Sequence, residues 1–537
     1  MFFRRARERR AVCLSARLPA MDADELLSGR VRLAGLPPVN LGERVDWRAD
    51  PHGNRSWMLN LHTLRWAGSL AAAYERTGEA RYLDRALAVA HDWIAANPEG
   101  DRETSPWAWA EHPIALRAPV LVCLAAHTRS APLEDSLARH AQLLADPASY
   151  RAGHNHGLDQ DIGLLVTACH LGRPRLRDLA IRRMTASAEL AIDDQGVLHE
   201  QAPRYAVYVH ARLGIALEAI AAAPGADVPP RRRKIAGPDL PSRLSRRRAA
   251  LEEHIQHATR PDGYLLPIGD GPADARPPAF SPAPAETVRV YDGGYVFGRT
   301  AWNDPGSAHY SIRFGPGRKL HGHEDHLGVT YYAHGRPILV EAGFHSYEKT
   351  PYTTWTRLPE AHNVPVVEGA RFRPGTATRL RTARITPRRQ SFTLDDTAYG
   401  VSRVREVVVH HGPDVLAVQD RVEGGATARS LWHFAPSLRV LTRGKGLVVL
   451  EDEDGWQVTL AQFTLPGGAP AHDSEVRRGL VSPGARRTAE VEIVVSPAAA
   501  ALLTLIVPGC AAPEIAVADG GVSVTTPEGT APCWGWT

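Results

Sequence analysis

The feature that most constrains this chain is a change in the spacing of its apolar residues near residue 286. Before that point apolar residues recur every three or four positions, as on one face of a helix, and after it they recur at every second position, as in a strand. A Pro-rich stretch, "DARPPAFSPAPAE" from Asp274 to Glu286, lies at the change and has the composition of an interdomain linker. The sequence therefore predicts a helical half followed by a β half.

The helical half is predicted to be a string of antiparallel helical hairpins. In "WMLNLHTLRWAGSLAAAYERTG" the residues Trp57, Leu61, Leu64 and Tyr74 share one face, and Gly78 is a typical helix stop. Further helices are predicted at 81–98, 132–145, 157–171, 174–192, 206–222 and 245–258. This pattern fits a bundle, a solenoid or an incomplete (α/α) toroid, and periodicity alone does not separate the three.

The β half carries β-branched and aromatic runs punctuated by Gly, Pro and Asp. The turn "HHGPD" separates two strands in "VSRVREVVVHHGPDVLAVQDRV", and "DEDG" separates two more. Such a series of strands predicts a large antiparallel β-sandwich. The predicted organisation is an N-terminal extension at 1–45, a helical domain at 46–275, a linker at 276–285 and the sandwich at 286–537.

The composition argues against membrane and nucleic-acid proteins. Hydrophobic residues make up 44% of the chain, and no apolar run approaches the ~20 residues of a membrane helix. The net charge is only +4, and the basic clusters at 4–10 and 231–248 are interpreted as a solvated tail and a solvated linker. We therefore expect no membrane and no nucleic-acid partner.

The cysteines and the N-terminus bear on the cellular compartment. The five cysteines are scattered without a C-x-x-C pair, so neither a disulfide framework nor a thiolate zinc site is predicted. The N-terminus is basic but lacks the apolar segment of about 7–15 residues that a secretory signal requires. The sequence leaves the location open, and without an export signal it favours the cytoplasm over secretion.

The stretch "GRKLHGHEDHLGVT", Gly317 to Thr330, gathers three histidines before a strand-like run. Alternate residues of an extended segment face the same side, so His321 and His323 can converge on one pocket. Together with His323, Glu341 in "ILVEAG" and His362 in "EAHNVPVVEG" would complete two imidazoles and one carboxylate, a donor set that suits zinc. A polar loop is the alternative, because 24 histidines also produce clusters by chance.

Two polar stretches of the helical half have both a functional and a structural interpretation. "GHNHGLDQDIGLL" sets Asn155 and His156 at a helix entrance, where Asn is also a routine N-cap. "HEQAPRYAVYVHARLG" places Tyr205 and Tyr208 three residues apart, which is one helical face if the helix already starts there. Tyrosines at that spacing also serve as core residues or as the wall of a groove.

Six short motifs occur in an order that resembles one family. They are "NHG" from Asn155, "EQAPRY" from Glu200, "PDGYLLPIGDG" from Pro261, "HGHED" from His321, "RPILVEAG" from Arg336 and "AHNVPVVEG" from Ala361. The chain thereby resembles heparinase II/III-like polysaccharide lyases, which include heparin and heparan sulfate lyases and relatives that act on alginate. The resemblance extends from about Trp57 to beyond "LWHF" at Leu431 to Phe434.

The resemblance implies a fold and a set of catalytic residues. The fold is an incomplete (α/α) toroid followed by an antiparallel β-sandwich, with the active cleft between them. Asn155 matches the asparagine that neutralises the uronate carboxylate, and His156 matches the histidine beside it. Tyr205 matches the catalytic tyrosine, with Tyr208 as the alternative, and His321 matches the catalytic histidine.

The resemblance also implies a metal. His323, Glu341 and His362 match the metal-ligand positions, so Zn²⁺ is expected in a structural, site-organising role. Relatives commonly carry Asp where this chain has Glu341. Glutamate is one methylene longer and still able to bind a metal.

The implied activity is that of a carbon-oxygen lyase acting on polysaccharides. It would cleave uronic-acid-containing glycans by β-elimination and leave 4,5-unsaturated uronate ends. An anionic uronate-containing oligo- or polysaccharide is then the expected partner, and a homodimer is left open.

Two other functions stay open at this point. One is an (α/α) toroid glycoside hydrolase, with Asp159, Asp161 and Glu200 as candidate carboxylates. The other is a catalytically inactive homologue that only binds glycans.

Overall fold

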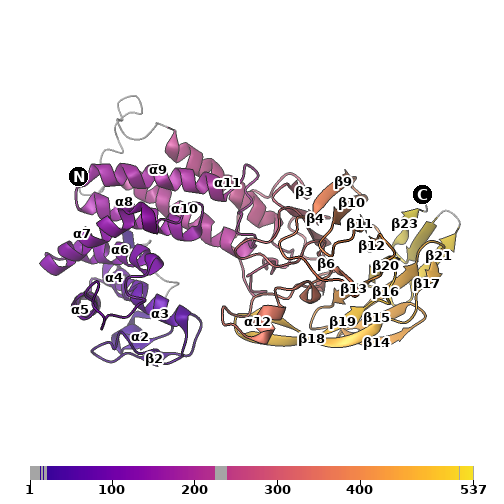
Figure 1. Cartoon of the computed structure of the whole chain (residues 1–537), viewed down its shortest axis with the longest axis horizontal. Helices are drawn as coiled ribbons and strands as arrows, with labels where there is room; N and C mark the ends of the chain where they lie inside the picture. The colour runs from indigo at the N-terminus through magenta and orange to yellow at the C-terminus, as the bar shows by residue number, and fades with distance from the viewer. Residues whose placement is uncertain (1–11, 14–15, 17–20, 224–238, 519–520, 536–537) are drawn as a thin grey trace. The chain divides into compact units, whose positions relative to one another are not determined.

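The structure is a computed structural model that describes residues 12–13, 16, 21–223, 239–518 and 521–535 (Figure 1). The chain divides into two compact units, the first made of Met1–Gly196 and Tyr208–Ala250 and the second of Val197–Val207 and Leu251–Thr537. The predicted domain limits at 45, 275 and 285 stay a prediction. The basic clusters at 4–10 and 231–234 lie outside the described residues.

Helices build the first unit, and two of them continue into the second. Their bounds are α2 Ala23–Leu27, α3 Arg55–His62, α4 Arg65–Thr77, α5 Ala80–Ala96, α6 Glu111–Ala125, α7 Ala131–Ala145, α8 Asn155–His170, α9 Pro174–Ala191, α10 Pro203–Ala222 and α11 Leu240–His257. Six of the seven predicted helices are confirmed within a few residues. Gly78 ends α4 as predicted, with a left-handed φ of 75° and its N–H donated to the Tyr74 carbonyl.

The structure corrects the prediction for the helical half in two places. The segment predicted as one helix from Trp57 is two helices, α3 and α4, because buried Leu64 adopts a left-handed φ of 54°. Helix α6 was not predicted at all. It is buried on every side and contains Pro119, so it shows no amphipathic period, although it packs against α3, α4, α5, α7 and α8.

One cysteine pair also departs from the prediction. Cys13 and Cys123 form a disulfide, with their Cα atoms 5.6 Å apart. They are 110 residues apart in the sequence, and no local spacing signals such a pair.

Antiparallel strands build the second unit, as predicted. A five-stranded sheet has the order β3-β4-β5-β6-β7, and a larger sheet has the order β14-β15-β16-β20-β12-β11-β10-β9 with β17 beside β16. A four-stranded sheet, β18-β19-β13-β8, and a three-stranded sheet, β21-β22-β23, complete the unit. The predicted turns "HHGPD" and "DEDG" join β11 to β12 and β15 to β16.

The strand bounds are β3 Val288–Tyr291, β4 Tyr295–Arg299, β5 His309–Arg313, β6 Val329–Ala333, β7 Arg336–Leu339, β8 Pro365–Val367, β9 Arg379–Ile385, β10 Arg389–Asp396, β11 Arg403–His410 and β12 Val415–Val422. They continue as β13 Ala428–His433, β14 Arg439–Gly444, β15 Leu447–Glu451, β16 Gln457–Thr464, β17 Ala469–Pro470, β18 Glu475–Gly484, β19 Arg487–Val495, β20 Ala501–Pro508, β21 Glu514–Ala518, β22 Gly521–Thr526 and β23 Gly529–Gly535. Short β1 Arg30–Val31 and β2 Val39–Asn40 pair near the start of the chain.

The central strands of the large sheet are buried on both faces, with an apolar core on each side. Val407 and Val409 of β11 point into a core shared with the five-stranded sheet, which contributes Tyr310 and Val329. Val408, between them, points into a core shared with the three-stranded sheet. Period-two alternation therefore sends neighbouring valines of one strand to opposite layers.

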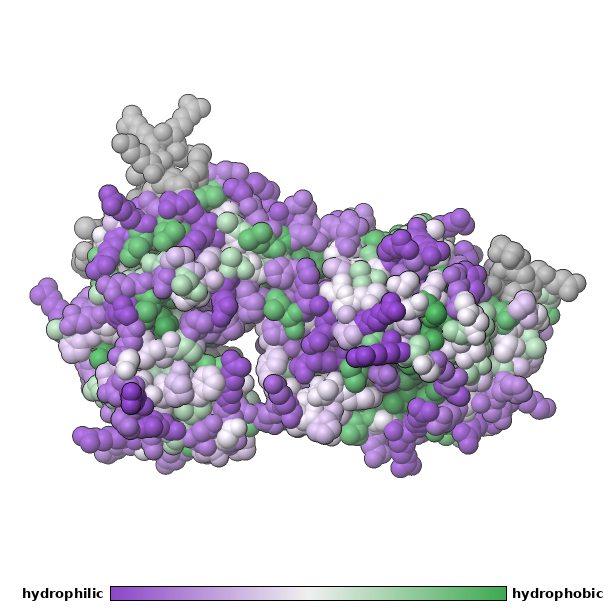
Figure 2. Space-filling view, in the orientation of Figure 1, coloured by the Kyte–Doolittle hydropathy of each residue, from purple (hydrophilic) through white to green (hydrophobic). Residues whose placement is uncertain are grey.

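Helix α10 is the one helix in the described ranges that is long and apolar enough to cross a membrane. Half of its apolar window is buried inside the protein, and core helices meet the same criterion. On the face drawn in Figure 2, hydrophobic residues form separate patches among hydrophilic ones.

Candidate active site

The second unit brings Tyr205 and His321 into direct contact. Their rings stack with centroids 3.6 Å apart and an angle of 8° between the planes. The Tyr205 hydroxyl is hydrogen-bonded to the hydroxyl of Tyr347, which also lies 3.2 Å from Nδ1 of His321. Burial raises the pKa of Tyr205 above its ordinary value, so this hydroxyl keeps its proton near neutral pH.

A buried carboxylate, Asp270, holds the His321 ring. Its Oδ2 lies 2.9 Å from His321 Nδ1, and Arg357 donates to its Oδ1 at 3.0 Å. Burial alone would raise the pKa of Asp270, but hydrogen bonds from His321 and His323 and the charge of Arg357 hold it below its ordinary value. An ionised carboxylate only accepts hydrogen bonds, so the contact with Asp270 places a proton on Nδ1 of His321, while Nε2 lies 3.7 Å from the buried Glu200 carboxylate.

Close backbone contacts hold these residues in place. The His321 N–H donates to the Glu200 carbonyl at 3.1 Å, and the Asp270 N–H donates to the His321 carbonyl at 2.8 Å. Gly269 has a left-handed φ of 63°, and a Cβ there would meet the His321 carbonyl oxygen at 2.5 Å. A side chain at Gly322 would likewise meet Gln201 at 2.4 Å. The glycines of "GDG" and "HGH" therefore allow segments far apart in the sequence to approach.

The predicted metal ligands lie near one another behind this cluster. The rings of His323 and His362 have centroids 5.4 Å apart, and His362 Nδ1 is hydrogen-bonded to Glu341. All three side chains are buried. Burial acts to lower the pKa of His362, but the Glu341 carboxylate beside it more than offsets this and holds the pKa above its ordinary value.

The donor types fit a zinc ion, although the three donors do not meet at one point. His362 Nε2 is buried without a hydrogen-bond partner, as expected for a nitrogen that would face a cation. His323 instead gives its Nε2 to Asp270 at 3.2 Å. Within the described ranges, the one group with three potential ligand atoms inside 4.8 Å of one another is Cys13, Glu75 and Cys123, whose sulfurs are joined.

The first unit holds Asn155 and His156 at the start of α8. Asn155 is buried and is not the N-cap, because the side chain of His154 accepts the N–H of His156. His156 Nδ1 lies 3.0 Å from Glu111, and its ring stacks on His112 with centroids 3.7 Å apart. These residues form a polar cluster of their own.

Tyr208 also belongs to the first unit, where it donates to buried Asp159 at 2.6 Å. Asp159 accepts a further hydrogen bond from Arg212 at 2.6 Å and contacts His112 at 2.9 Å. The structure therefore brings Tyr205, and not Tyr208, together with His321.

The candidate carboxylates of a glycoside hydrolase are engaged in buried contacts. Asp159 is paired with Arg212, and Asp161 is paired with Arg183 at 3.1 Å. Both are fully buried, as is Glu200. A hydrolase needs one carboxyl poised as an acid and another facing water or the sugar. Burial raises the pKa of Asp161 to about 8, which suits an acid, but none of the three buried carboxyls faces water or a sugar.

Two family profiles match the chain. The one described as "Heparinase II/III N-terminus" covers residues 22–130, and the one described as "Heparinase II/III-like, C-terminal" covers residues 284–536. The chain belongs to the heparinase II/III-like family. This is a family of polysaccharide lyases.

Solved structures of the family share the fold. A heparinase III crystal structure matches with a TM-score of 0.75 and 17% identity, over 97% of this chain and 90% of that one. Heparan sulfate lyase HepC from Pedobacter heparinus matches with a TM-score of 0.69 and 16% identity, over 96% and 89% of the two chains. A search of curated proteins finds no match. The chain thus has the predicted N-terminal helical toroid and C-terminal β-sandwich of these heparinases.

Two residues that contact His321, Asp270 and Tyr347, were not predicted from the sequence. Asp270 lies within the quoted motif "PDGYLLPIGDG" but had no role, although a carboxylate beside a catalytic histidine is a recurring arrangement. Tyr347 lies in the loop after β7, where no periodicity or spacing marks it. Tyr347 is 48% exposed. The exposure of a large aromatic side chain beside polar residues can be recognised in the structure but not in the sequence.

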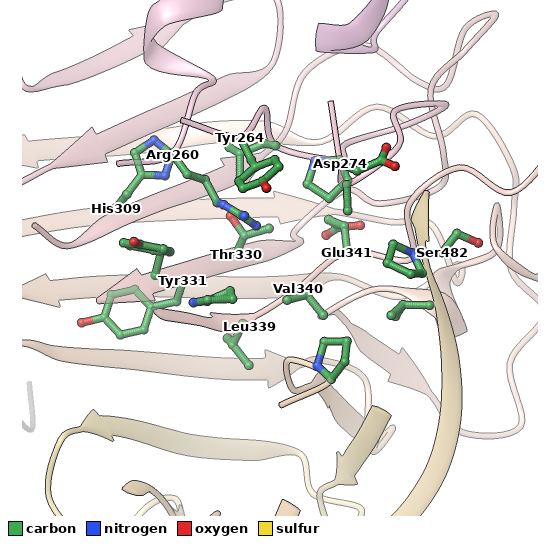
Figure 3. A pocket seen from close by; sticks show the side chains of 18 of the residues that line it. Arg260, Tyr264, Asp274, His309, Thr330, Tyr331, Leu339, Val340, Glu341 and Ser482 are labelled. Carbon is green, nitrogen blue, oxygen red and sulfur yellow. The ribbon is translucent and has the colours of Figure 1, made fainter. Parts of the chain in front are cut away.

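A cavity of about 310 Å³ lies in the second unit beside Glu341, one of the predicted metal ligands. Glu341 lines it together with Arg260, Tyr264, His309 and Ser482 (Figure 3). Tyr205, His321, Tyr347 and Asp270 are not among its lining residues. The cavity therefore borders Glu341 and not the stacked pair of Tyr205 and His321.

Proposed function

We propose that this chain is a polysaccharide lyase that cleaves uronate-containing glycans by β-elimination. The observation that carries the proposal is the stacking of Tyr205 on His321, with Asp270 behind the imidazole. A hydroxyl that can donate a proton and an imidazole that can accept one thus lie side by side. The family to which the chain belongs supports the same reaction type.

In the proposed reaction His321 is the base. Its alternative role is to stabilise the charge that develops on the uronate. Its Nε2 accepts the C5 proton of the uronate, because Asp270 keeps the other ring nitrogen protonated. The C5–H electron pair becomes the C4=C5 double bond, and the bond from C4 to the glycosidic oxygen breaks. Tyr205 donates its proton to the departing oxygen, and its raised pKa keeps that proton available.

A uronate carboxylate is already negative, so removing the C5 proton requires its charge to be neutralised. We assign this role to Asn155, with His156 beside it, on the match of "NHG" to the family. Hydrogen bonds that strengthen as charge develops in the transition state are often the main source of rate enhancement in such a reaction.

The proposal predicts that the wild-type protein generates near-ultraviolet absorbance from a uronate glycan, and that His321→Ala loses about 10²–10⁴-fold in kcat. The measurement is an absorbance assay over a panel of heparan, alginate and other uronate oligosaccharides. His326→Ala is the matched control, because His326 lies in the same loop but bonds the Thr376 carbonyl and not the cluster. New reducing ends without new absorbance would show a hydrolase, and no product on any substrate would indicate a binding protein.

We further propose that His323, Glu341 and His362 hold a Zn²⁺ ion. When bound, the ion would supply a fixed positive charge that orders the loop carrying His321. The supporting observations are the buried donor set and the unpartnered His362 nitrogen.

The zinc proposal predicts bound metal in the purified protein and a lower melting temperature after chelation. Zinc at 100 times its dissociation constant would stabilise the fold by about 2.7 kcal/mol. Elemental analysis and thermal melts should show metal lost in His362→Ala but kept in Glu341→Asp, which restores the residue common in relatives. Metal-free protein with an unchanged melting temperature in added zinc would contradict the assignment.

A further inference from the structure

A row of arginines follows the edge of the large sheet. Residues 370–390, "ARFRPGTATRLRTARITPRRQ", contain seven arginines and no Asp or Glu. The whole chain has a net charge of only +4, so the positive charge of this segment alone is larger than the net charge of the entire protein. We call it the basic edge.

Strand β9 forms the centre of the basic edge. It pairs with β10 on one side and is the last strand of its sheet, so its outer side has no strand partner within the described part of the chain. Six of its seven positions are exposed, including Arg379, Arg381 and Arg384. At ~3.3 Å per residue, Arg379 and Arg384 lie roughly 17 Å apart along the strand.

The arginines of the basic edge outnumber the acidic groups around them. Arg379 and Arg381 are both paired with Asp395 of β10 at 2.8 Å. Glu406 of β11 and Glu423 lie near enough to interact with the edge. Among the described residues no ion pair engages Arg384 or Arg388, and Arg388 is exposed in the turn that follows.

The opposite edge of the same sheet has a different character. Strand β14 exposes Arg439 and Arg443, but its partner β15 ends in Glu451, and Asp452 and Glu453 follow. Charged side chains on edge strands prevent two sheets from pairing edge to edge, and either sign of charge serves that purpose. Protection against edge-to-edge pairing accounts for the mixed charges around β14. It does not require the seven arginines without an acidic residue in the basic edge.

We propose that the basic edge binds an acidic polysaccharide chain, outside the catalytic cluster of Tyr205 and His321. The choice of this partner rests on the proposed function, because a uronate polymer is the polyanion that the lyase would meet. Arginine forks suit carboxylate and sulfate groups, and a linear row suits a linear polymer. The basic edge would hold polymer near the enzyme and would leave the turnover of short oligosaccharides unaffected.

The test is charge reversal at two exposed arginines of the basic edge that have no ion pair among the described residues. Arg384→Glu with Arg388→Glu keeps the edge charged, so protection against aggregation survives while attraction to a polyanion is lost. We expect affinity for heparin to fall roughly 10-fold or more at low salt, with a shallower dependence on salt. Arg439→Glu with Arg443→Glu on β14 is the matched control and should change affinity by less than about 2-fold. Heparin binding is measured by titration at several salt concentrations in a His321→Ala background, so that no cleavage occurs.

Each result decides the proposal. Equal losses at β9 and β14 would show a bulk-charge effect and overturn it, as would unchanged affinity in the β9 variant. Equal affinity of the wild type for heparin and for single-stranded DNA, lost together in the β9 variant, would overturn the glycan assignment. Turnover of a short unsulfated uronate oligosaccharide by the wild type tests the lyase function separately, and the β9 variant with His321 intact should match that rate. No turnover by the wild type, with its heparin binding intact, would reject the lyase and retain the binding surface.

Discussion

Tyr205→Phe should lower kcat on a uronate oligosaccharide by about 10²–10⁴-fold, the usual contribution of a positioned proton donor. The substitution removes only the hydroxyl, so the ring can still stack on His321. KM should change little, because the hydroxyl acts on the leaving oxygen in the transition state and not on the resting substrate. Initial rates of near-ultraviolet absorbance give both constants.

Tyr208→Phe is the control that makes this result specific. It removes the same hydroxyl three residues along, where the phenol donates to Asp159. Asp159 keeps Arg212 and His112, so the expected cost is about 1–2 kcal/mol of stability with a much smaller loss of rate. A larger kcat loss in Tyr208→Phe than in Tyr205→Phe would assign the catalytic tyrosine to Tyr208. Full activity in both variants would transfer the role to Tyr347, the remaining hydroxyl at His321.

The fold was predictable where one face of an element is apolar and the other is polar. Helices such as α5 show their period in the sequence, whereas β11, buried on both faces, is marked instead by its run of β-branched valines. Helix α6 does not, because every face of it is buried and a buried helix has no polar side to mark its period. The left-handed turn at Leu64 is also invisible, since leucine has no preference for that conformation.

The candidate site was predictable only in part, because its residues come from separate segments. The alternation in "HGH" predicted that His321 and His323 converge, and the structure shows both contacting Asp270, one on each carboxylate oxygen. Asp270 itself lies about 50 residues upstream, and Tyr347 lies in an irregular loop. Hydrophobic patterning carries no information about such contacts, and only a folded chain reveals them. The roles of Asn155 and His156, and the zinc ligands, stay predictions.

Buried Arg405 connects the β-sandwich to the histidine-bearing segments, and Arg405→Met should destabilise the second unit by about 3–5 kcal/mol. The guanidinium is fully buried and forms two hydrogen bonds with Asp420, at 2.6 and 2.7 Å. Its remaining nitrogen donates to the carbonyls of Leu327 and Asn363, the residues next to His326 and His362. The substitution leaves a buried carboxylate and two carbonyls without their donor, and a thermal melt should record a fall of roughly 10 °C.

Two comparisons separate this buried pair from an ordinary ion pair. Arg477→Met removes an exposed arginine that bonds Glu475, and surface pairs contribute ~0–1 kcal/mol, so its melt should stay near that of the wild type. Arg405→Met combined with Asp420→Leu removes the stranded charge and should recover part of the lost stability. The two carbonyls would still lack a donor, so lyase activity at low temperature should stay below wild type even when the melt recovers. Wild-type stability in Arg405→Met alone would show that water replaces the guanidinium, and that Arg405 does not fix the loops carrying His326 and His362.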